Sequence, residues 1–370
     1  ATIDNTTTAL GVEGTVAGNL SLTSGGAITD SGTLTVSGTT TATTDVNDQA
    51  ITLGSLVSSG NVILTTQGTA GHVTIDNTTT ALGVEGTVAG NLALTSGGAI
   101  TDSAALTVSG TTTVTTDVND IAINLGTLAS SGNVILTTQG TTGHVTIDNT
   151  TTTLGLEGTV AGTLTATSGH ASGITDSGNL VVNGDVTLTT DDNNGVVNLG
   201  TLQQSTGDLV ITTHGTGDAT VVNNIGIDFG ASNIGGNLLA TATTGDITQN
   251  GGALTVAGNS GFTAGTNATN IILGQASNAF TGQVTLLAGA GGNQTFGNIT
   301  FVDDSAVKLD TNADAAGDLF LNGSTDGAVG GDLVITATTG DITQGVALAV
   351  TGTSSFTTSA ADATITLGTT

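Results

Sequence analysis

Apolar and polar residues alternate along this chain with a period of two. Leu20 and Leu22 precede Ile28, and Leu34 and Val36 follow, with threonine or serine between most of the neighbouring apolar positions. This alternation is typical of strands that bury one face, because successive side chains of a strand point to opposite sides. Clusters of glycine, asparagine, aspartate and serine separate the runs, as turns require. No stretch has the period of an amphipathic helix, so the pattern predicts an all-β fold.

The pattern itself recurs along the chain. The segment TIDNTTTALGVEGTVAGNL at residues 2–20 returns at 74–92 and, nearly unchanged, at 146–164, which gives a repeat of 72 residues. Self-similarity at a fixed period indicates stacked units that bury their apolar sides against one another. The Gly-Asn dipeptides divide the first repeat into segments of 21, 21 and 30 residues. We interpret each segment as one coil, the longest with a protruding loop or an extra short strand.

Stacked coils of this length predict a parallel β-helix, or β-solenoid. About three short strands and their turns make a coil, and each strand then pairs with its counterparts in the neighbouring coils. We expect about 20–24 residues per coil, some longer coils, and three coils per 72-residue superrepeat. About sixteen coils, each rising roughly 4.8 Å, would form a rod on the order of 75 Å long.

The whole chain is predicted to form a single continuous solenoid over residues 1–370. Its superrepeats are placed at 18–89, 90–161, 162–235 and 236–330, with partial ones at 1–17 and 331–370. The superrepeat that begins at Gly236 has 95 residues, which predicts an extra turn inserted near 282–330. The alternative is a tandem array of antiparallel sandwiches, but such domains usually carry a buried tryptophan or tyrosine, and this chain has neither.

Composition limits the classes of function. The chain has 58 glycines, 29 acidic residues and Lys308 as its one basic residue besides four histidines, for a formal charge of −28. Binding to nucleic acid or to anionic lipid requires many lysines and arginines, so neither partner is expected. No apolar run is long enough for a membrane helix, so no direct membrane insertion is expected. With no cysteine, the fold depends on neither disulfides nor thiolate metal sites.

Three segments carry a family resemblance: GNLSLTSGGAITDSGTLTVSGTTT at 18–41, GNLALTSGGAITDSAALTVSGTTT at 90–113 and GDLVITATTGDITQGVALAVTGTSSF at 331–356. They resemble the repeats of filamentous-haemagglutinin-like giant bacterial proteins, many of them adhesins exported by two-partner secretion. The resemblance implies a right-handed parallel β-helix on the cell surface or in the extracellular matrix. The secretion domain that identifies that family is not visible in this sequence, so the resemblance supports the shaft more than a route of export.

Catalytic constellations are sparse. Lyase chemistry on a β-helix commonly needs a basic side chain, and glycoside hydrolysis needs a pair of carboxylates. Adjacent acids occur at Asp191 with Asp192 and at Asp303 with Asp304, and both pairs are interpreted as solvated turns. His72 and His144 lie one repeat apart and are interpreted as one exposed position at the start of a strand. We therefore expect no enzyme activity and no required cofactor.

Calcium is the one ligand that the sequence suggests. Asp310, Asn312, Asp314 and Asp318 place oxygen ligands as in the first part of a calcium loop, although the glycine and the closing glutamate of such loops are missing. Asp45, Asn47 and Asp48, with their repeat at 117–120, offer a weaker version of the same pattern. The alternative in each case is an ordinary polar loop.

These observations predict a non-enzymatic extracellular shaft, secreted or on the cell surface, that belongs to a giant adhesin or to a filament or sheath. The expected partners are other copies or neighbouring repeats end to end, and host or matrix glycans. The alternative is a carbohydrate-binding or polysaccharide-cleaving β-helix with its working face in 259–330. That region holds five of the seven phenylalanines, and rings pointing outward in a row would favour a sugar platform, whereas rings in the core would not: Phe262, Phe280, Phe296, Phe301 and Phe320.

Overall fold

The computed structural model describes residues 1–370 except 151, 290–291, 293, 311–314, 324 and 369–370. The chain divides into two compact units, Ala1–Gly184 and Asp185–Thr370. Each unit is a parallel β-solenoid, and no helix occurs among the described residues. The predicted right-handed parallel β-helix is thereby confirmed as the fold class.

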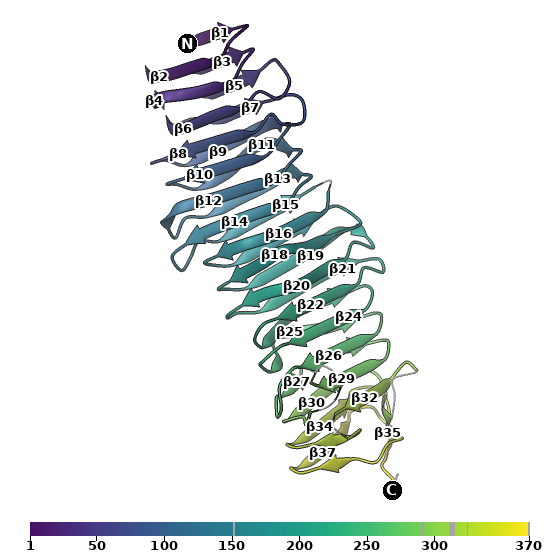
Figure 1. The fold of residues 1–370 in the computed structure, drawn as a ribbon. Coiled ribbons are helices and arrows are strands. Elements are labelled where there is room, and N and C mark those ends of the chain that lie inside the picture. Colours follow the sequence, from purple (N-terminus) through teal and green to yellow (C-terminus); the bar gives the residue numbers. More distant parts are fainter. Residues whose placement is uncertain (151, 290–291, 293, 311–314, 324, 369–370) are drawn as a thin grey trace. The chain divides into compact units, whose positions relative to one another are not determined.

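The first unit winds between two parallel sheets, seen as the purple to blue-green rungs of Figure 1. Strands with odd numbers form sheet A, and strands with even numbers form sheet B, so each coil contributes one strand to each. Sheet A contains β1 (Thr2–Asn5), β3 (Leu20–Ser24), β5 (Thr40–Thr44), β7 (Val62–Thr65), β9 (Leu82–Val88), β11 (Ile100–Val108), β13 (Ile123–Ser130), β15 (Val145–Asn149) and β17 (Leu164–Ser168). Sheet B contains β2 (Leu10–Val16), β4 (Ile28–Val36), β6 (Ile51–Ser58), β8 (Val73–Asn77), β10 (Leu92–Ser96), β12 (Thr112–Asn119), β14 (Val134–Gln139), β16 (Leu154–Val160) and β18 (Ile174–Val182).

Alternation decides which side chains form the core. In β3, Leu20 and Leu22 are buried, and the threonine and serine between them and beyond lie on the outer side or at the corner. Leu22 stacks in register on Ile3 of the preceding coil and on Ala42 of the following one. Each fully buried leucine or valine contributes about 1.5–3 kcal/mol through removal of apolar area from water. The period-two pattern was therefore a correct guide to the strands and to their inward faces.

The 72-residue repeat does not hold a whole number of coils. Leu20 and the equivalent Leu92 lie in β3 and β10, which are seven strands apart, and each coil has two strands. Leu20 consequently pairs with Thr40 in sheet A, whereas Leu92 pairs with Thr112 in sheet B. The repeat spans three and a half coils, so the prediction of three coils per superrepeat is wrong. The 30-residue segment is the reason, because it holds the three strands β7, β8 and β9, which make one coil and an extra strand, the second of the two possibilities predicted for it.

Glycines with positive φ lie at the bends of the equivalent strands β2, β9 and β16. Gly14, Gly86 and Gly158 have φ of 109°, 119° and 113°, a backbone conformation that residues other than glycine rarely adopt. The pairing register shifts at the same places, for example between Val12 and Gly14 where β2 meets β4. A shift of this kind bends a strand and turns its two arms to different sides of the coil.

The second unit repeats this architecture with more variation. One sheet contains β19 (Val186–Asn193), β21 (Leu209–His214), β23 (Ile227–Ile234), β25 (Ile247–Val256), β27 (Ile271–Leu273), β28 (Ala279–Phe280), β30 (Ile299–Asp303), β34 (Leu333–Ala337) and β37 (Ser354–Thr358). The other contains β20 (Val197–Gln204), β22 (Ala219–Asn223), β24 (Leu238–Ala242), β26 (Ser260–Ala264), β29 (Val284–Ala288), β31 (Val307–Asp310), β32 (Asp318–Asn322), β35 (Ile342–Gln344) and β38 (Ile365–Thr366). A third side is formed by β33 (Ala328–Val329) and β36 (Ala349–Val350).

The extra residues near 282–330 lengthen the steps along the first sheet and add one strand to the second. Along the first of these sheets, Ile271 pairs with Ile299 and Ile299 pairs with Leu333, which are steps of 28 and 34 residues. The step from Ile247 to Ile271 is 24 residues. The superrepeat from 236 to 330 thus still spans three and a half coils, from β24 to β34. The predicted extra turn is therefore present as an added strand in one sheet and not as a whole coil, because β31 and β32 both lie in the second sheet and β32 pairs with β29 and with β31.

Phenylalanine rings fill the interior of these later coils. Phe229, Phe262, Phe280 and Phe301 are fully buried or nearly so, and successive rings lie 6.1, 6.0 and 5.2 Å apart between centroids. The first two contacts are edge-to-face and the third is stacked, the arrangements that aromatic rings prefer. The larger rings occupy the space that leucine and valine fill in the first unit.

Candidate functional site

Polar side chains at the corners of the first unit bind the backbone of the next coil. Asn19 Oδ1 accepts a hydrogen bond from the backbone nitrogen of Thr39 at 3.1 Å, and Asn91 Oδ1 accepts one from Thr111 at 3.0 Å. Each acceptor directly precedes a strand, and the donor lies one coil further on. We call such a series of contacts an edge ladder. It provides an acceptor for an amide at the corner, where the sheet's own pairing ends.

Edge ladders run further in the second unit. Asp246 accepts from Asn270, Asn270 from Asn298, Asn298 from Asp332 and Asp332 from Thr353, at 2.7–2.8 Å. Another ladder joins Asp218, Asn237, Asn259 and Gln283 at 2.7–3.1 Å. In both ladders a carboxylate or an amide oxygen serves equally as the acceptor. The ladders therefore give Asp218, Asp246 and Asp332 a structural role without any ligand.

The Gly-Asn dipeptide is the sequence signature of these ladders. In the dipeptides Gly258-Asn259 and Gly297-Asn298, a Cβ on Gly258 would lie 2.6 Å from Asn237 Oδ1, and one on Gly297 would lie 2.6 Å from Asn270 Oδ1. Only glycine leaves room for the ladder side chain of the coil before it. The two residues recur together because the glycine makes room for the ladder side chain of the preceding coil, and the asparagine accepts a backbone hydrogen bond from the following coil.

Histidine replaces asparagine at two ladder positions. Nδ1 of His72 accepts the backbone hydrogen of Asn91 at 2.9 Å, and Nδ1 of His144 accepts that of Thr163 at 3.0 Å. Both histidines are exposed and directly precede a strand, which confirms the sequence interpretation of a repeated position. Their role in the structure is that of a ladder acceptor.

A buried asparagine closes the opposite corner in each repeat. Asn149 is fully buried at the end of β15, where its Oδ1 accepts from Ser130 nitrogen at 2.9 Å and its Nδ2 donates to Ser130 oxygen at 3.2 Å. Its Nδ2 also donates to the turn that follows, at Thr152 and Thr153. Asn77 and Asn223 make the matching pairs with Ser58 and Gln204. The role of these residues was not predicted from the sequence, although asparagine recurs at the same strand end in each copy of the repeat and could have indicated it.

Asp303 occupies a comparable strand end but carries a carboxylate. It is 2% exposed, so the prediction of a solvated turn is wrong for this residue. Its Oδ1 accepts from the backbone nitrogens of Phe280 and Asp304, both at 2.9 Å, and its Oδ2 from the Ser305 hydroxyl at 2.8 Å. Burial raises the pKa of Asp303 despite these hydrogen bonds. Asp191 and Asp192, by contrast, are exposed at the end of β19, as predicted.

The turn acids at 45–48 and 117–120 organise a loop of the neighbouring coil. Asp48 Oδ1 accepts from the backbone nitrogens of Thr69 and Ala70 at 2.6 and 2.7 Å, and Asp120 Oδ1 does so from Thr141 and Thr142. These hydrogen bonds hold the pKa of both carboxyl groups below the usual range. The two residues have φ of 63°, the left-handed conformation that aspartate tolerates. Their geometry is that of a structural loop anchor.

The predicted calcium residues lie partly outside the described residues. Asn312 and Asp314 belong to the undescribed part of the chain, whereas Asp310 and Asp318 both face Lys308. The Lys308 ammonium is in contact with Asp310 and lies 3.4 Å from Asp318 Oδ1. The carboxylates, Asp310 first, raise the pKa of Lys308. Lys308 therefore stands between the two carboxylates that a calcium ion would need to bridge.

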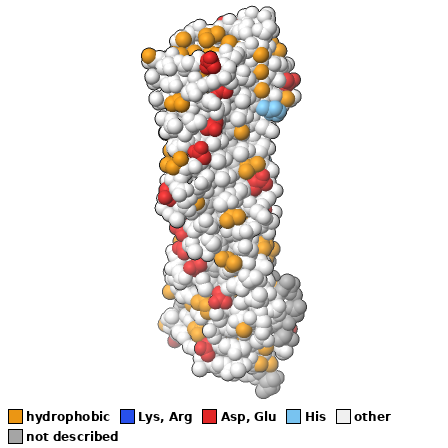
Figure 2. Space-filling view, turned by 60° about the vertical axis from the view of Figure 1, so that its left-hand side comes forward, with side chains coloured by type: hydrophobic (Ala, Val, Ile, Leu, Met, Phe, Trp, Pro, Cys, Tyr) orange, Lys and Arg blue, Asp and Glu red, His pale blue; other side chains and the backbone are white. Residues whose placement is uncertain are grey.

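Within the described ranges, no three histidine, aspartate or glutamate side chains come together in an arrangement that would hold a metal ion. On the face shown in Figure 2, acidic side chains are dispersed among uncharged ones. No helix that could cross a bilayer is found in the part of the chain that the structure describes.

The candidate carbohydrate face at 259–330 turns most of its phenylalanine rings inward. Phe262, Phe280, Phe296 and Phe301 are at most 2% exposed, and Phe320 is partly exposed on the outer side of β32. The first four rings therefore belong to the core. One partly exposed phenylalanine does not make the platform on which successive sugars would stack.

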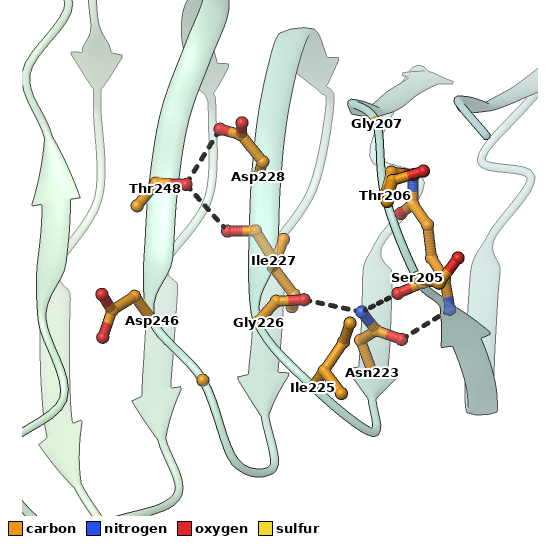
Figure 3. A pocket seen from close by; sticks show the side chains of 12 residues that line it. Ser205, Thr206, Gly207, Asn223, Ile225, Gly226, Ile227, Asp228, Asp246 and Thr248 are labelled. Carbon is orange, nitrogen blue, oxygen red and sulfur yellow. Dashed lines mark hydrogen bonds between the residues drawn. The ribbon is translucent and has the colours of Figure 1, made fainter. Parts of the chain in front are cut away.

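One hollow on the surface lies in the second unit, at a corner where three turns meet (Figure 3). Its volume is about 390 Å³. Ser205 and Thr206 lie on one side, Ile225 lines the middle, and Asp228, Asp246 and Thr248 lie on the side formed by β23 and β25. It combines hydroxyl groups, an aliphatic surface and two carboxylates.

The fold and the ladders define a structural class, the parallel β-solenoid built from sequence repeats. Comparison with protein families agrees that the chain is built from sequence repeats. The family described as "Repeats of unknown function (DUF5649)" matches residues 1–65, 70–137, 216–287 and 296–370, and the chain belongs to this family. No curated protein and no solved structure shows a significant match to the chain.

Proposed function

We propose that this chain is a non-enzymatic extracellular shaft, part of a giant surface adhesin or of a secreted filament or sheath. The observation that carries the proposal is the use of the corner side chains. Asparagine, aspartate and histidine at these positions accept backbone hydrogens of the neighbouring coil, as in the ladder from Asp246 to Thr353. These side chains hold successive coils together, so their acceptor atoms already have a structural role.

The extracellular setting is supported by composition and by family resemblance. The repeats resemble those of filamentous-haemagglutinin-like proteins, and trypsin-like proteases would find Lys308 alone as a cleavage residue. The charge of −28 opposes close lateral packing of copies in the absence of counterions. End-to-end contact between copies or neighbouring repeats is the association that suits a solenoid, since terminal strands present unpaired backbone groups.

Electron microscopy of the purified chain tests the shaft. A single continuous solenoid would give rods on the order of 75 Å long, and polymerisation would give fibres with an axial repeat of roughly 4.8 Å. Isolated rods would support an adhesin stalk, and continuous fibres a filament. Compact particles without an elongated axis would contradict both forms of the proposal.

Immunolabelling of intact cells from the source organism tests the location. Antibodies raised against the chain should label unpermeabilised cells or the surrounding matrix, and external protease should remove the signal. Labelling only after permeabilisation would contradict an extracellular role. A cytoplasmic marker protein provides the control for cell integrity.

A further inference from the structure

Three equivalent corners of the repeat use different side chains for the same contact. His72, His144 and Asp218 directly precede β8, β15 and β22. Each accepts the backbone hydrogen of a residue one coil further on, at 2.9, 3.0 and 2.7 Å. The copies therefore differ in chemistry and not in the contact itself. Histidine is the side chain that normally changes its charge between pH 5 and 8, which sets the first two corners apart.

The contact at His72 requires a neutral ring. The backbone nitrogen of Asn91 can only donate a hydrogen bond, so Nδ1 of His72 must be the unprotonated nitrogen of the imidazole. The carbonyl oxygen of Asn91 accepts from the backbone nitrogen of Val73 at 2.8 Å. The ring and the start of β8 thus hold both backbone polar groups of one residue. His144 and the start of β15 hold Thr163 in the same way.

Protonation would turn this acceptor into a donor. An imidazolium ring carries hydrogen on both nitrogens, so Nδ1 of His72 would face the amide of Asn91 as a second donor, with no acceptor between them. Both His72 and His144 are exposed, so each ring can leave its corner without unpacking the core. The amide of the following coil then loses its side-chain partner.

An aspartate of the preceding coil lies near the ring of His72. Asp48 anchors the loop that leads to His72 by accepting from the backbone nitrogens of Thr69 and Ala70. These two hydrogen bonds are the main causes that lower the pKa of Asp48, and the nearby charge of His72 adds to them. Neighbours of the ring on its own loop and on the following coil are uncharged: Gly71, Gly90 and Asn91. In the next repeat, the matching residues around His144 are Asp120, Gly143, Gly162 and Thr163.

We propose that His72 and His144 form acid-sensitive junctions between coils. In the neutral form, each ring accepts the amide hydrogen of the following coil. When the ring takes up a proton, it leaves that amide and turns toward the aspartate of the preceding coil, so the corner opens at mildly acidic pH. The two junctions lie before strands of different sheets, β8 and β15, so acid loosens a corner of each sheet in the first unit. This inference does not rest on the proposed shaft function.

The other two histidines make different contacts. Nδ1 of His214 lies against the carbonyl oxygen of Thr190, so it donates there and keeps this contact in either charge state. Nδ1 of His170 accepts from the backbone nitrogen of Ser172 at 3.1 Å, two residues further along the same turn. Protonation of His170 would therefore act mainly within one turn. The junction chemistry belongs to the repeated position before β8 and β15.

Hydrogen exchange of the full chain, followed by NMR between pH 8 and pH 5, tests the proposal. After correction for the intrinsic pH dependence of exchange, protection of the Asn91 and Thr163 amides should fall about fivefold, as expected for loss of one hydrogen bond. The Asn237 amide should keep its protection, because its acceptor is Asp218 and a carboxyl group retains an acceptor oxygen in either charge state. Nitrogen chemical shifts of the two rings should show Nδ1 without hydrogen at the upper pH.

Variants separate the imidazole from the corner. His72→Asn and His144→Asn supply the acceptor that Asn91 provides at its own corner, so they should keep the protection and remove its dependence on pH. Asp48→Asn keeps an oxygen for the loop but removes the negative charge. It should therefore move the loss of protection at Asn91 to lower pH, because the protonated ring is no longer stabilised by a carboxylate.

Several results would overturn the proposal. The Asn91 and Thr163 amides could keep their protection in acid, or the asparagine variants could lose it to the same extent as the native chain. An equal loss at Asn237 would show a general loosening by acid. A hydrogen on Nδ1 of either ring at the upper pH would contradict the neutral junction, and an unchanged transition in Asp48→Asn would contradict the turn toward Asp48.

Discussion

Asn91 Oδ1 lies 3.0 Å from the backbone nitrogen of Thr111, one coil further along sheet B. The residue before Thr111 is Gly110, where a Cβ would lie 2.2 Å from the same oxygen. The hydrogen bond therefore requires a glycine at position 110, because any larger residue would collide with the acceptor. Its presence in both units, with asparagine, aspartate or histidine as acceptor, links the repeat in the sequence to the stacking of the coils.

Gly110→Ala should destabilise the chain by about 1–3 kcal/mol, because the new methyl group collides with Asn91 and with the Gly90 backbone. Chemical denaturation measures the effect as a lower midpoint. Gly54→Ala is the matched control, since a Cβ there meets nothing within 4 Å. Equal loss of stability in both variants would show that general strand effects, not the ladder, cause the change.

Asn149→Leu should cost about 3 kcal/mol, because the backbone nitrogen and oxygen of Ser130 lose their side-chain partner in a buried corner. Hydrogen exchange of the Ser130 amide should rise in parallel with the fall in stability. Asn124→Leu, at an exposed position of β13, serves as the control. A loss confined to the Asn124 variant would contradict the role given to Asn149.

Asp303→Asn should stabilise the chain at neutral pH. The pKa of Asp303 is raised in the folded state, so the folded chain holds this proton more tightly than the unfolded one. Its contribution to stability is therefore complete below the ordinary value of 3.8 and is lost as the pH rises through the folded pKa. The gain from asparagine should disappear in acid, as measured by denaturation at several pH values. A gain that persists unchanged in acid would contradict this account, and Asp191→Asn is the charge-matched control.

Asp120→Ala should release the loop at 140–142, because the backbone nitrogens of Thr141 and Thr142 lose their acceptor. The lowered pKa of Asp120 gives the opposite pH dependence from Asp303. Its stabilisation is present above the ordinary value of 3.8 and is lost as the pH falls through the lower folded value. Hydrogen exchange at these two amides measures the effect, and Asp120→Asn should retain most of the protection. Equal exchange in the alanine and asparagine variants would argue against the hydrogen bonds as the cause.

Lys308→Gln should increase affinity for calcium in the loop that holds Asp310 and Asp318, because the ammonium in contact with these carboxylates is removed. Terbium luminescence or calorimetry with calcium can compare the variant with the native chain. Lys308→Arg keeps the positive charge and should bind no more calcium than the native chain does. Unchanged affinity in the glutamine variant would contradict competition between Lys308 and the ion.

The sequence was sufficient for the strands and for the parallel stacking. Alternation at Leu20 and Leu22 predicted the inward face correctly, because the period of a strand is fixed by its backbone. The number of coils per repeat was wrong because Gly-Asn marks only some of the corners. His72 stands at an equivalent corner, before β8, and this hid one of the boundaries between strands.

Neither the hollow nor the burial of Asp303 could be predicted from the sequence. Both depend on what one coil places against another, such as the turn of Asn223 beside that of Gln204. The sequence around Asp303 predicts an exposed turn. Only the pairing of β30 with β27 and β34 shows that the residue is enclosed. Local composition carries little information on such contacts between neighbouring coils.

Each repeat of the first unit has seven strands, and strands alternate between two sheets, so equivalent residues of successive repeats lie in opposite sheets. Glu13 and Glu157 lie in sheet B, whereas the equivalent Glu85 lies in sheet A. A surface feature encoded once per repeat therefore returns to the same side only after two repeats, or about 34 Å at roughly 4.8 Å per coil. Loss or duplication of a single repeat during evolution would exchange the two sides for everything downstream within that solenoid. Changes by pairs of repeats would alter its length alone.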